Sequence, residues 1–147
     1  MRRLKGWGFP ALVLLGSGVL GAVRDTRYGG DIVWARDYRS GLELARQAHK
    51  PLLLSFRDPG CDWCAKLDAE TFTDSDVVTL SHRYVCVLVE SDVDSDVVSQ
   101  YGVMKYPMTL LVDPQGRPLF RLSGYLPPDR LAPVLRAALQ ASDRNAP

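Results

Sequence analysis

Residues 52–66 read LLLSFRDPGCDWCAK and contain two of the three cysteines of the chain. The apolar start of this stretch predicts a buried strand, and the residues after Cys61 favour a helix. If the helix begins at or just after Cys61, the sulfur faces the unpaired N–H groups of the first turn, and the helix dipole favours its thiolate form. Cys64 lies one turn further on, close enough to close a small ring with Cys61. The stretch therefore predicts thiol–disulfide exchange.

The segments around this stretch alternate between strand and helix patterns. A helix is expected from Ser40, which can cap it together with Glu43, to the break at Pro51. The run Tyr84–Val89 is the strongest strand pattern, and its continuous apolar character indicates burial on both faces. The other expected elements are a strand or ordered lead-in at 32–34, a short helix capped by Thr73 or Asp74, a helix over 96–101, strands over 107–112 and 119–122 joined by a turn, and a final helix from Pro127 or Pro128. This order predicts an α/β domain with a mixed sheet.

The composition is that of a globular domain with an extension. The chain has 147 residues, of which 46% are hydrophobic and 24% are charged. Its formal charge is +1, but without residues 1–22 fifteen basic side chains face seventeen acidic ones. No basic surface signal remains, so nucleic acid is not an expected partner. Three cysteines are too few for a disulfide scaffold, and one pair with one leftover is typical of a redox or a metal site.

The N-terminus has the pattern of an export segment. A short basic start precedes the uncharged stretch Gly6–Val23. Residues 1–23 therefore predict either a cleaved signal peptide or a retained membrane tether, and the sequence leaves both open. Residues 24–30 are expected to be a linker, 31–141 the folded domain and 142–147 a tail. We expect an exported protein, in the periplasm or another extracytoplasmic compartment.

Several separate segments carry a resemblance to a known family. They are AHKPLLLSF (48–56), the motif Cys-Asp-Trp-Cys, ETFTDSDVV (70–78) and YGVMKYPMTLLVDPQGRPLFRLSGY (101–125). Their order and spacing resemble the thioredoxin-like superfamily, and more narrowly its secreted branch, over roughly residues 31–141. The resemblance implies the thioredoxin-like fold, a mixed central sheet flanked by helices. It also implies that the bond between Tyr106 and Pro107 is cis, that Pro107 packs beside the cysteine pair, and that this loop binds substrate through its backbone.

The chain departs from thioredoxins proper around the motif. Their tryptophan before the first cysteine is Gly60 here, and their Gly-Pro is Asp62-Trp63. Their buried acid, which helps proton transfer to the second cysteine, falls on Ser55, so a water or a different carboxylate is expected to serve. Asp62 raises the pKa expected for a neighbouring thiol and disfavours the reduced form, which favours a reductase unless Arg57 or Lys66 offsets its charge.

The predicted reaction needs only the two cysteines of the motif and no cofactor. Cys61 attacks a partner's disulfide, and Cys64 resolves the mixed disulfide. Trp63 either offers an apolar surface to partner peptides or packs on the helix start. The expected partners are proteins with thiols or disulfides and, for a reductase, a membrane protein that supplies electrons.

Three other interpretations of the motif remain open. A redox-silent binding or chaperone module would use the groove at Pro107 to hold a client. A zinc site would need further ligands, for which Cys86, His82 and His49 are available. A structural disulfide between Cys61 and Cys64 is the third. Because Cys86 lies in mid-strand, where an inert buried thiol is the commoner role, no metal site is expected.

Overall fold

The described part of the chain forms one mixed six-stranded sheet. The computed structural model describes residues 22–23 and 30–144. The strand order is β1-β2-β4-β3-β5-β6, in which β2, β4 and β3 are parallel and β1, β5 and β6 run antiparallel to their neighbours. The strands are β1 (Ala22–Val23), β2 (Trp34–Ala35), β3 (Leu52–Arg57), β4 (Val85–Glu90), β5 (Met108–Val112) and β6 (Pro118–Ser123). The predicted mixed sheet is confirmed, with the long strands within one or two residues of their expected ends.

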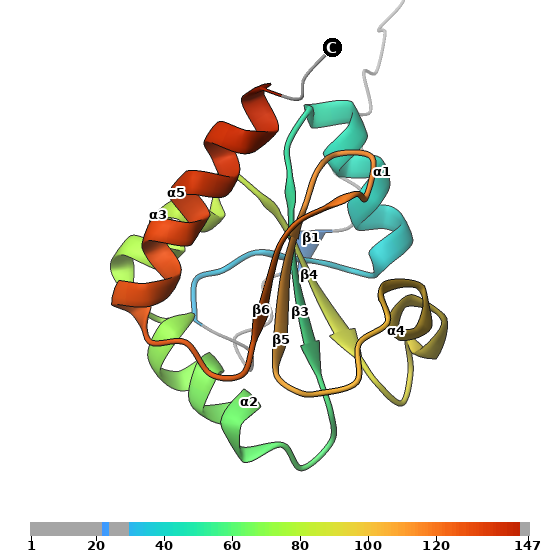
Figure 1. Ribbon diagram of the computed structural model, residues 1–147, viewed down its shortest axis with the longest axis vertical. Helices are drawn as coiled ribbons and strands as arrows, with labels where there is room; N and C mark the ends of the chain where they lie inside the picture. The colour runs from blue at the N-terminus through green and yellow to red at the C-terminus, as the bar shows by residue number, and fades with distance from the viewer. Residues whose placement is uncertain (1–21, 24–29, 145–147) are drawn as a thin grey trace, which may run out of the picture.

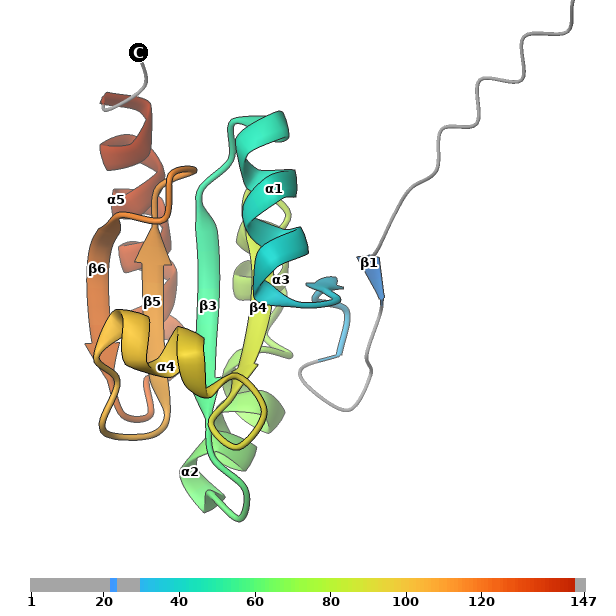
Figure 2. The ribbon, with the colours of Figure 1, turned by 90° about the vertical axis from the view of Figure 1, so that its right-hand side faces the viewer.

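Helices cover both faces of this sheet (Figures 1 and 2). On one face lie α1 (Tyr38–Ala48) and α4 (Ser95–Tyr101); on the other lie α2 (Asp62–Lys66), the π-helical turn η1 (Leu67–Thr71), α3 (Ser75–Ser81) and α5 (Pro128–Arg144). Side chains alternate along each strand. Leu54 of β3 therefore joins the core under α1 and α4, whereas Leu53 joins the core under α3 and α5. The central strands are apolar on both faces because both faces are covered.

The start of α1 corrects the sequence prediction. The cap is Asp37, not Ser40: the Asp37 carboxylate accepts from Ser40 N at 2.7 Å, and the Ser40 hydroxyl accepts from Asp37 N at 3.3 Å. Ser40 thus closes a capping box from its third helical position. Glu43 instead accepts a hydrogen bond from Gln47 at 2.8 Å. An aspartate one turn earlier satisfies the same orphan N–H groups, so the helix begins at Tyr38.

The predicted domain limits can be compared with the structure at the C-terminal end, whereas most of the predicted N-terminal segments lie outside the described residues. The helix α5 continues to Arg144, so residues 142–144, assigned by the sequence to the tail, are helical and Ser142 is buried. Residues 1–21 and 24–29, which hold most of the predicted export segment and linker, lie outside the described residues. Within residues 30–144, no helix combines the length and apolar character that crossing a bilayer requires.

The topology brings three loops to one edge of the sheet. Because β3 and β4 are parallel, their last residues, Arg57 and Glu90, are register partners. The strand β5 runs the other way and begins at Met108, opposite Phe56. Loops 58–61, 91–94 and 102–107 therefore meet at this edge, which is drawn at the bottom of Figure 1 and is called the carboxyl edge below.

Candidate functional site

Cys61 and Cys64 form a disulfide at the carboxyl edge. Their Cα atoms are 5.2 Å apart, and Cys61 is the N-cap of α2, as the sequence predicts. The Cys61 sulfur accepts a hydrogen bond from Cys64 N at 3.1 Å, so it occupies the place of a capping side chain at the positive end of the helix. Cys61 is half-buried, whereas Cys64 is only 2% exposed. An approaching partner therefore meets Cys61 first.

The loop before β5 carries the expected cis bond between Tyr106 and Pro107. Its position follows from the antiparallel pairing of β3 with β5, which sets Phe56 opposite Met108 and brings the loop to the edge that holds the cysteines. The Pro107 carbonyl accepts from Gly124 N at 2.8 Å, which ties this loop to the end of β6. The cis geometry is confirmed, and substrate binding by Tyr106 and Pro107 stays a prediction.

A group of two aromatic rings and one ammonium, of which Trp63 and Lys66 are exposed and Tyr125 is half-buried, lies beside the disulfide. The centroids of the Trp63 and Tyr125 rings are 5.9 Å apart, and the Lys66 ammonium lies 5.2 Å from the first and 4.8 Å from the second. The Tyr125 hydroxyl donates to Glu70 at 2.6 Å, and this charged partner raises the pKa of Tyr125. Trp63, Lys66 and Tyr125 are called the aromatic ledge below. Trp63 is 57% exposed, so its indole is available to a partner.

Sequence reasoning missed Tyr125. It lies far from the motif in sequence and comes next to Trp63 only because β6 ends at the carboxyl edge. The only signal was its place at the end of the last family-like segment, directly after Gly124. The sequence offers Lys66 as a cation that could offset the negative charge of Asp62. In the structure its ammonium lies over the two rings instead.

A buried charged cluster lies behind the disulfide. The Arg57 guanidinium is 2.6 Å from the Asp68 carboxylate and 3.6 Å from that of Glu90. Only 11% of the Arg57 and Asp68 side chains is exposed, and burial raises the pKa of Asp68 and that of Glu90 while Arg57 opposes both shifts. Asp68 follows Cys64 by four residues on one continuous helical segment, and both side chains are buried, so they share a face. Arg57 is thus engaged by carboxylates other than Asp62.

Comparison with known proteins agrees with this geometry. Residues 38–139 match the family model described as a thioredoxin-like domain. The chain belongs to the thioredoxin-like family. It is 31% identical over 105 residues to a thioredoxin of Alicyclobacillus acidocaldarius subsp. acidocaldarius, a match that covers 69% of this chain and 93% of that protein. Together with the Cys-x-x-Cys pair, the family identifies the protein as a thiol–disulfide oxidoreductase.

Solved structures show the same fold. A thioredoxin from Thermus thermophilus has a TM-score of 0.63 at 22% identity and covers 69% of this chain and 82% of its own. The DsbH oxidoreductase has a TM-score of 0.64 at 22% identity, with 82% and 92% covered. The reduced C-terminal domain of DsbD from Neisseria meningitidis has a TM-score of 0.58 at 20% identity, with 68% and 92% covered. The thioredoxin-like fold predicted from the sequence is confirmed.

Two buried residues near the centre of the sheet, Cys86 and Ser55, were singled out by the sequence. Cys86 lies in β4, 2% exposed, with its thiol 3.7 Å from the Ser81 carbonyl, and burial raises its pKa to about 12. It is the inert buried thiol that its mid-strand position suggested. Among the described residues, no three His, Cys, Asp or Glu side chains come together in a way that could hold a metal ion. Ser55, at the place of the family's buried acid, is 3% exposed in mid-strand.

Proposed function

We propose that this protein is an exported thiol–disulfide reductase acting on protein disulfides. The observation that carries the reaction is the unequal exposure of the pair, with Cys61 half-buried at the surface and Cys64 buried behind it. A partner's disulfide can reach Cys61, and the mixed disulfide formed there lies next to Cys64. The first cysteine is therefore the attacking residue and the second the resolving one.

The exchange balances without a cofactor. In the reduced protein the Cys61 thiolate attacks one sulfur of the partner's disulfide, forms a mixed disulfide and releases the other sulfur as a thiolate. The Cys64 thiolate then attacks the Cys61 sulfur and releases the second partner thiolate. Two electrons pass to the partner, both partner sulfurs take up protons, and Cys61 and Cys64 end as a disulfide, the form seen in the structure.

The Cys64 thiol must lose its proton before it attacks. Ser55 offers no carboxylate at the usual place, so we assign this role to Asp68, the buried acid one turn after Cys64. Burial raises the pKa of Asp68, and a higher pKa makes its carboxylate a stronger base toward the Cys64 thiol. Arg57, 2.6 Å away, holds this carboxylate in place.

The charges around the pair support the reductive direction. Asp62 is exposed directly after Cys61 and disfavours a thiolate there. The two cations that could offset it are engaged elsewhere, Arg57 with Asp68 and Glu90, and Lys66 over the rings of the aromatic ledge. A less stable thiolate makes the dithiol a better electron donor.

The uncharged stretch after the basic start supports export, with residues 1–23 as signal peptide or tether. Outside the cytoplasm the Cys61–Cys64 disulfide formed in each reaction must be reduced again. A membrane protein that relays electrons from the cytoplasm would do this. Fractionation of cells that produce the full chain tests export, because recovery in the cytoplasm alone would contradict it.

Insulin reduction by the wild type and by Cys61→Ser tests the reaction. We expect activity in the wild type and only background in the variant; equal background in both would favour the redox-silent binding module. Cys64→Ser should trap a covalent partner on Cys61. A reduction potential near about −270 mV would support the reductase, and one near about −120 mV would indicate an oxidase.

A further inference from the structure

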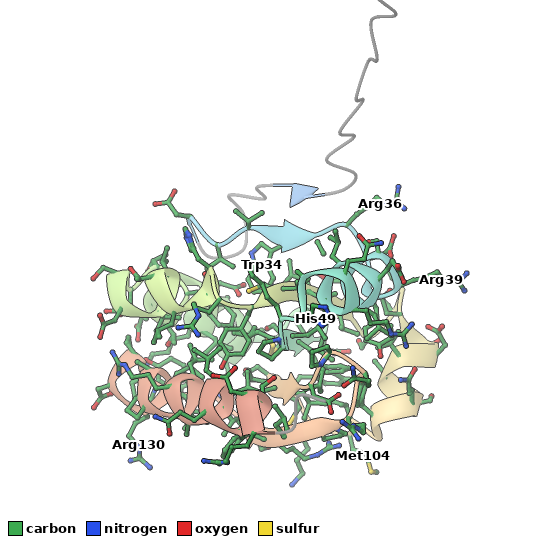
Figure 3. All side chains as sticks on the ribbon, turned by 90° about the horizontal axis from the view of Figure 1, so that it is seen from above. Trp34, Arg36, Arg39, His49, Met104 and Arg130 are labelled. Atoms are coloured by element: carbon green, nitrogen blue, oxygen red, sulfur yellow. A yellow bond between two sulfur atoms is a disulfide. The ribbon has the colours of Figure 1, made fainter. Side chains whose placement is uncertain are left out.

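The segments that form the aromatic ledge carry an excess of negative charge. Residues 58–70 and 124–129 contain the exposed acids Asp58, Asp62, Glu70 and Asp129, and one exposed cation, Lys66. Asp68, the fifth acid of these segments, is buried and paired with Arg57 at 2.6 Å. The next cation along α5, Arg130, points outward from the molecule, and so does Met104 of the loop before the cis bond (Figure 3). A partner that approaches Trp63 therefore meets one cation, the Lys66 ammonium over the rings, in segments whose exposed charge is negative in sum.

The rings of the ledge are held in place before any partner arrives. Tyr125 is fixed by its hydrogen bond to Glu70 at 2.6 Å, and the loop that carries it is fixed by the hydrogen bond from Thr71 to the Leu126 carbonyl at 2.6 Å. The Lys66 ammonium lies over both rings. Side chains that are already ordered lose little conformational freedom on binding, so the 57% of Trp63 that is exposed is a ready contact surface.

We propose that the aromatic ledge binds an arginine side chain next to the disulfide-bonded cysteine of the partner. The proposal rests on the exchange reaction proposed above and names the class of disulfide that it prefers. A guanidinium stacks on an indole face and at the same time donates hydrogen bonds to a carboxylate. Trp63 supplies the face, and the exposed acids Asp62 and Glu70 lie on the same helical segment.

Charge complementarity selects this occupant over the alternatives. An acidic residue beside the partner's cysteine would be repelled by four exposed carboxylates of residues 58–70 and 124–129, those of Asp58, Asp62, Glu70 and Asp129. An uncharged apolar residue would gain the indole surface but bring no positive charge to the exposed carboxylates. Lysine would bring the positive charge but not a planar group that can stack on the indole and donate hydrogen bonds to a carboxylate at the same time. Arginine alone uses both features of the ledge.

Three matched peptide disulfides test the proposal. They differ only in the residue beside the cysteine, which is arginine, glutamine or glutamate, and kcat/KM is compared with that for 2-hydroxyethyl disulfide. We expect the wild type to prefer the arginine peptide over the glutamate peptide by about tenfold, from one stacked cation and one exposed ion pair. The ratio between peptides cancels any change in the reactivity of Cys61 itself.

Variants assign the preference to the ledge. Trp63→Ala and Tyr125→Ala should bring the ratio close to one, whereas Tyr125→Phe keeps the ring and should keep most of the preference. Asp62→Lys, an exposed surface change, should shift the preference toward the glutamate peptide. Glu43→Gln on α1 removes an exposed acid outside these segments and should leave the ratio unchanged.

Specific results would overturn the proposal. Equal rates of the wild type on all three peptides would contradict it, and so would a preference that survives in both Trp63→Ala and Tyr125→Ala. An equal loss on every peptide and on 2-hydroxyethyl disulfide would assign the ledge a purely structural role. If the wild type fails to reduce 2-hydroxyethyl disulfide at all, the proposed exchange reaction fails, which is a different outcome from the loss of a preference.

Discussion

Asp68 shows how one residue links stability to the site. Replacing it with asparagine leaves the buried Arg57 guanidinium with Glu90, 3.6 Å away, as its remaining acidic partner in the cluster. Removing one partner of a buried ion pair leaves the other charge buried without full compensation. We therefore expect Asp68→Asn to lower the free energy of unfolding by about 3 kcal/mol. Urea unfolding of the oxidised protein measures this loss.

A surface ion pair provides the matched control. Asp76 pairs with Arg136 at 3.0 Å, but 70% and 52% of these side chains are exposed. Asp76→Asn should therefore cost less than about 1 kcal/mol. Similar losses in the two variants would show that the cluster behind the disulfide has no special energetic weight.

Cys86 should be chemically silent in the native protein. Burial raises its pKa to about 12, so the reactive thiolate is scarce near pH 8, and the protein around the thiol excludes reagents. We expect iodoacetamide to leave the oxidised native protein unmodified and to label one cysteine once the chain is unfolded without reductant. Mass spectrometry reads the label, and labelling of the native protein at the rate of a free thiol would contradict the expected burial.

The residues of the site divide by whether local sequence reveals them. The pairing of Cys61 with Cys64 was predictable from a local motif, and the cis bond before Pro107 was predictable from the family resemblance. Asp68 and Tyr125 were not, because each gains its meaning from a contact made elsewhere in the fold, with Arg57 at the end of β3 and with Trp63. Nothing in the sequence near Tyr125 indicates which side chain its ring will face.

At the scale of elements, the capping box of α1 makes a prediction about pH. Hydrogen bonds from Ser40, the backbone N–H first, lower the pKa of Asp37. A lowered carboxyl pKa means that the folded state favours the ionised form, so this stabilisation is present above the ordinary value of 3.8 and is lost as the pH falls through the folded-state pKa. Asp37→Ala should cost about 1 kcal/mol near neutral pH.

The same measurement repeated in acid tests the mechanism. The gap between wild type and Asp37→Ala in the free energy of unfolding should narrow as the pH falls below about 4, where Asp37 becomes protonated in both states. Ser40→Ala, which removes the other half of the box, is the control and should show a smaller pH dependence. A gap that stays constant would show that the carboxylate charge is irrelevant to the cap.

Elements were predictable where apolar residues form a continuous run or recur at a regular spacing. The run Leu52–Phe56 is buried along its whole length, because its side chains point alternately to two covered faces, and its continuous apolar character predicts the strand correctly. The cap of α1 was placed at Ser40 because its spacing to Glu43 fits the same pattern that Asp37 satisfies one turn earlier. The turn η1 had no sequence signal. In it the Phe72 N–H bonds to the carbonyl of Leu67, five residues back, at 3.0 Å, whereas an α-helix would use the carbonyl of Asp68.

At the scale of the whole molecule, charge governs the encounter with a partner. The parallel strands β3 and β4 end where Asp58 and Asp92 are exposed, and Asp129 is exposed at the start of α5, after β6. Two cations lie among these acids: Lys105 is exposed in the loop before β5, and Arg39 lines a cavity with Asp94 and Asp96 on the α1 side of the same edge. Exposed charges attract a distant partner only within a Debye length, about 10 Å at 0.1 M salt. Association with a cationic protein disulfide should therefore slow as salt is added, whereas a neutral small disulfide should be unaffected.

Stopped-flow reduction at two ionic strengths measures this steering. From about 0.02 M to about 0.5 M salt, we expect kcat/KM for a basic protein disulfide to fall by about tenfold and that for 2-hydroxyethyl disulfide to stay within about twofold. The double variant Asp92→Asn and Asp129→Asn keeps every ring of the aromatic ledge, so it should weaken the salt dependence without removing the choice of arginine over glutamine. A salt response equal for both disulfides would place the effect on the Cys61 thiolate itself, and steering by the carboxyl edge would then be rejected.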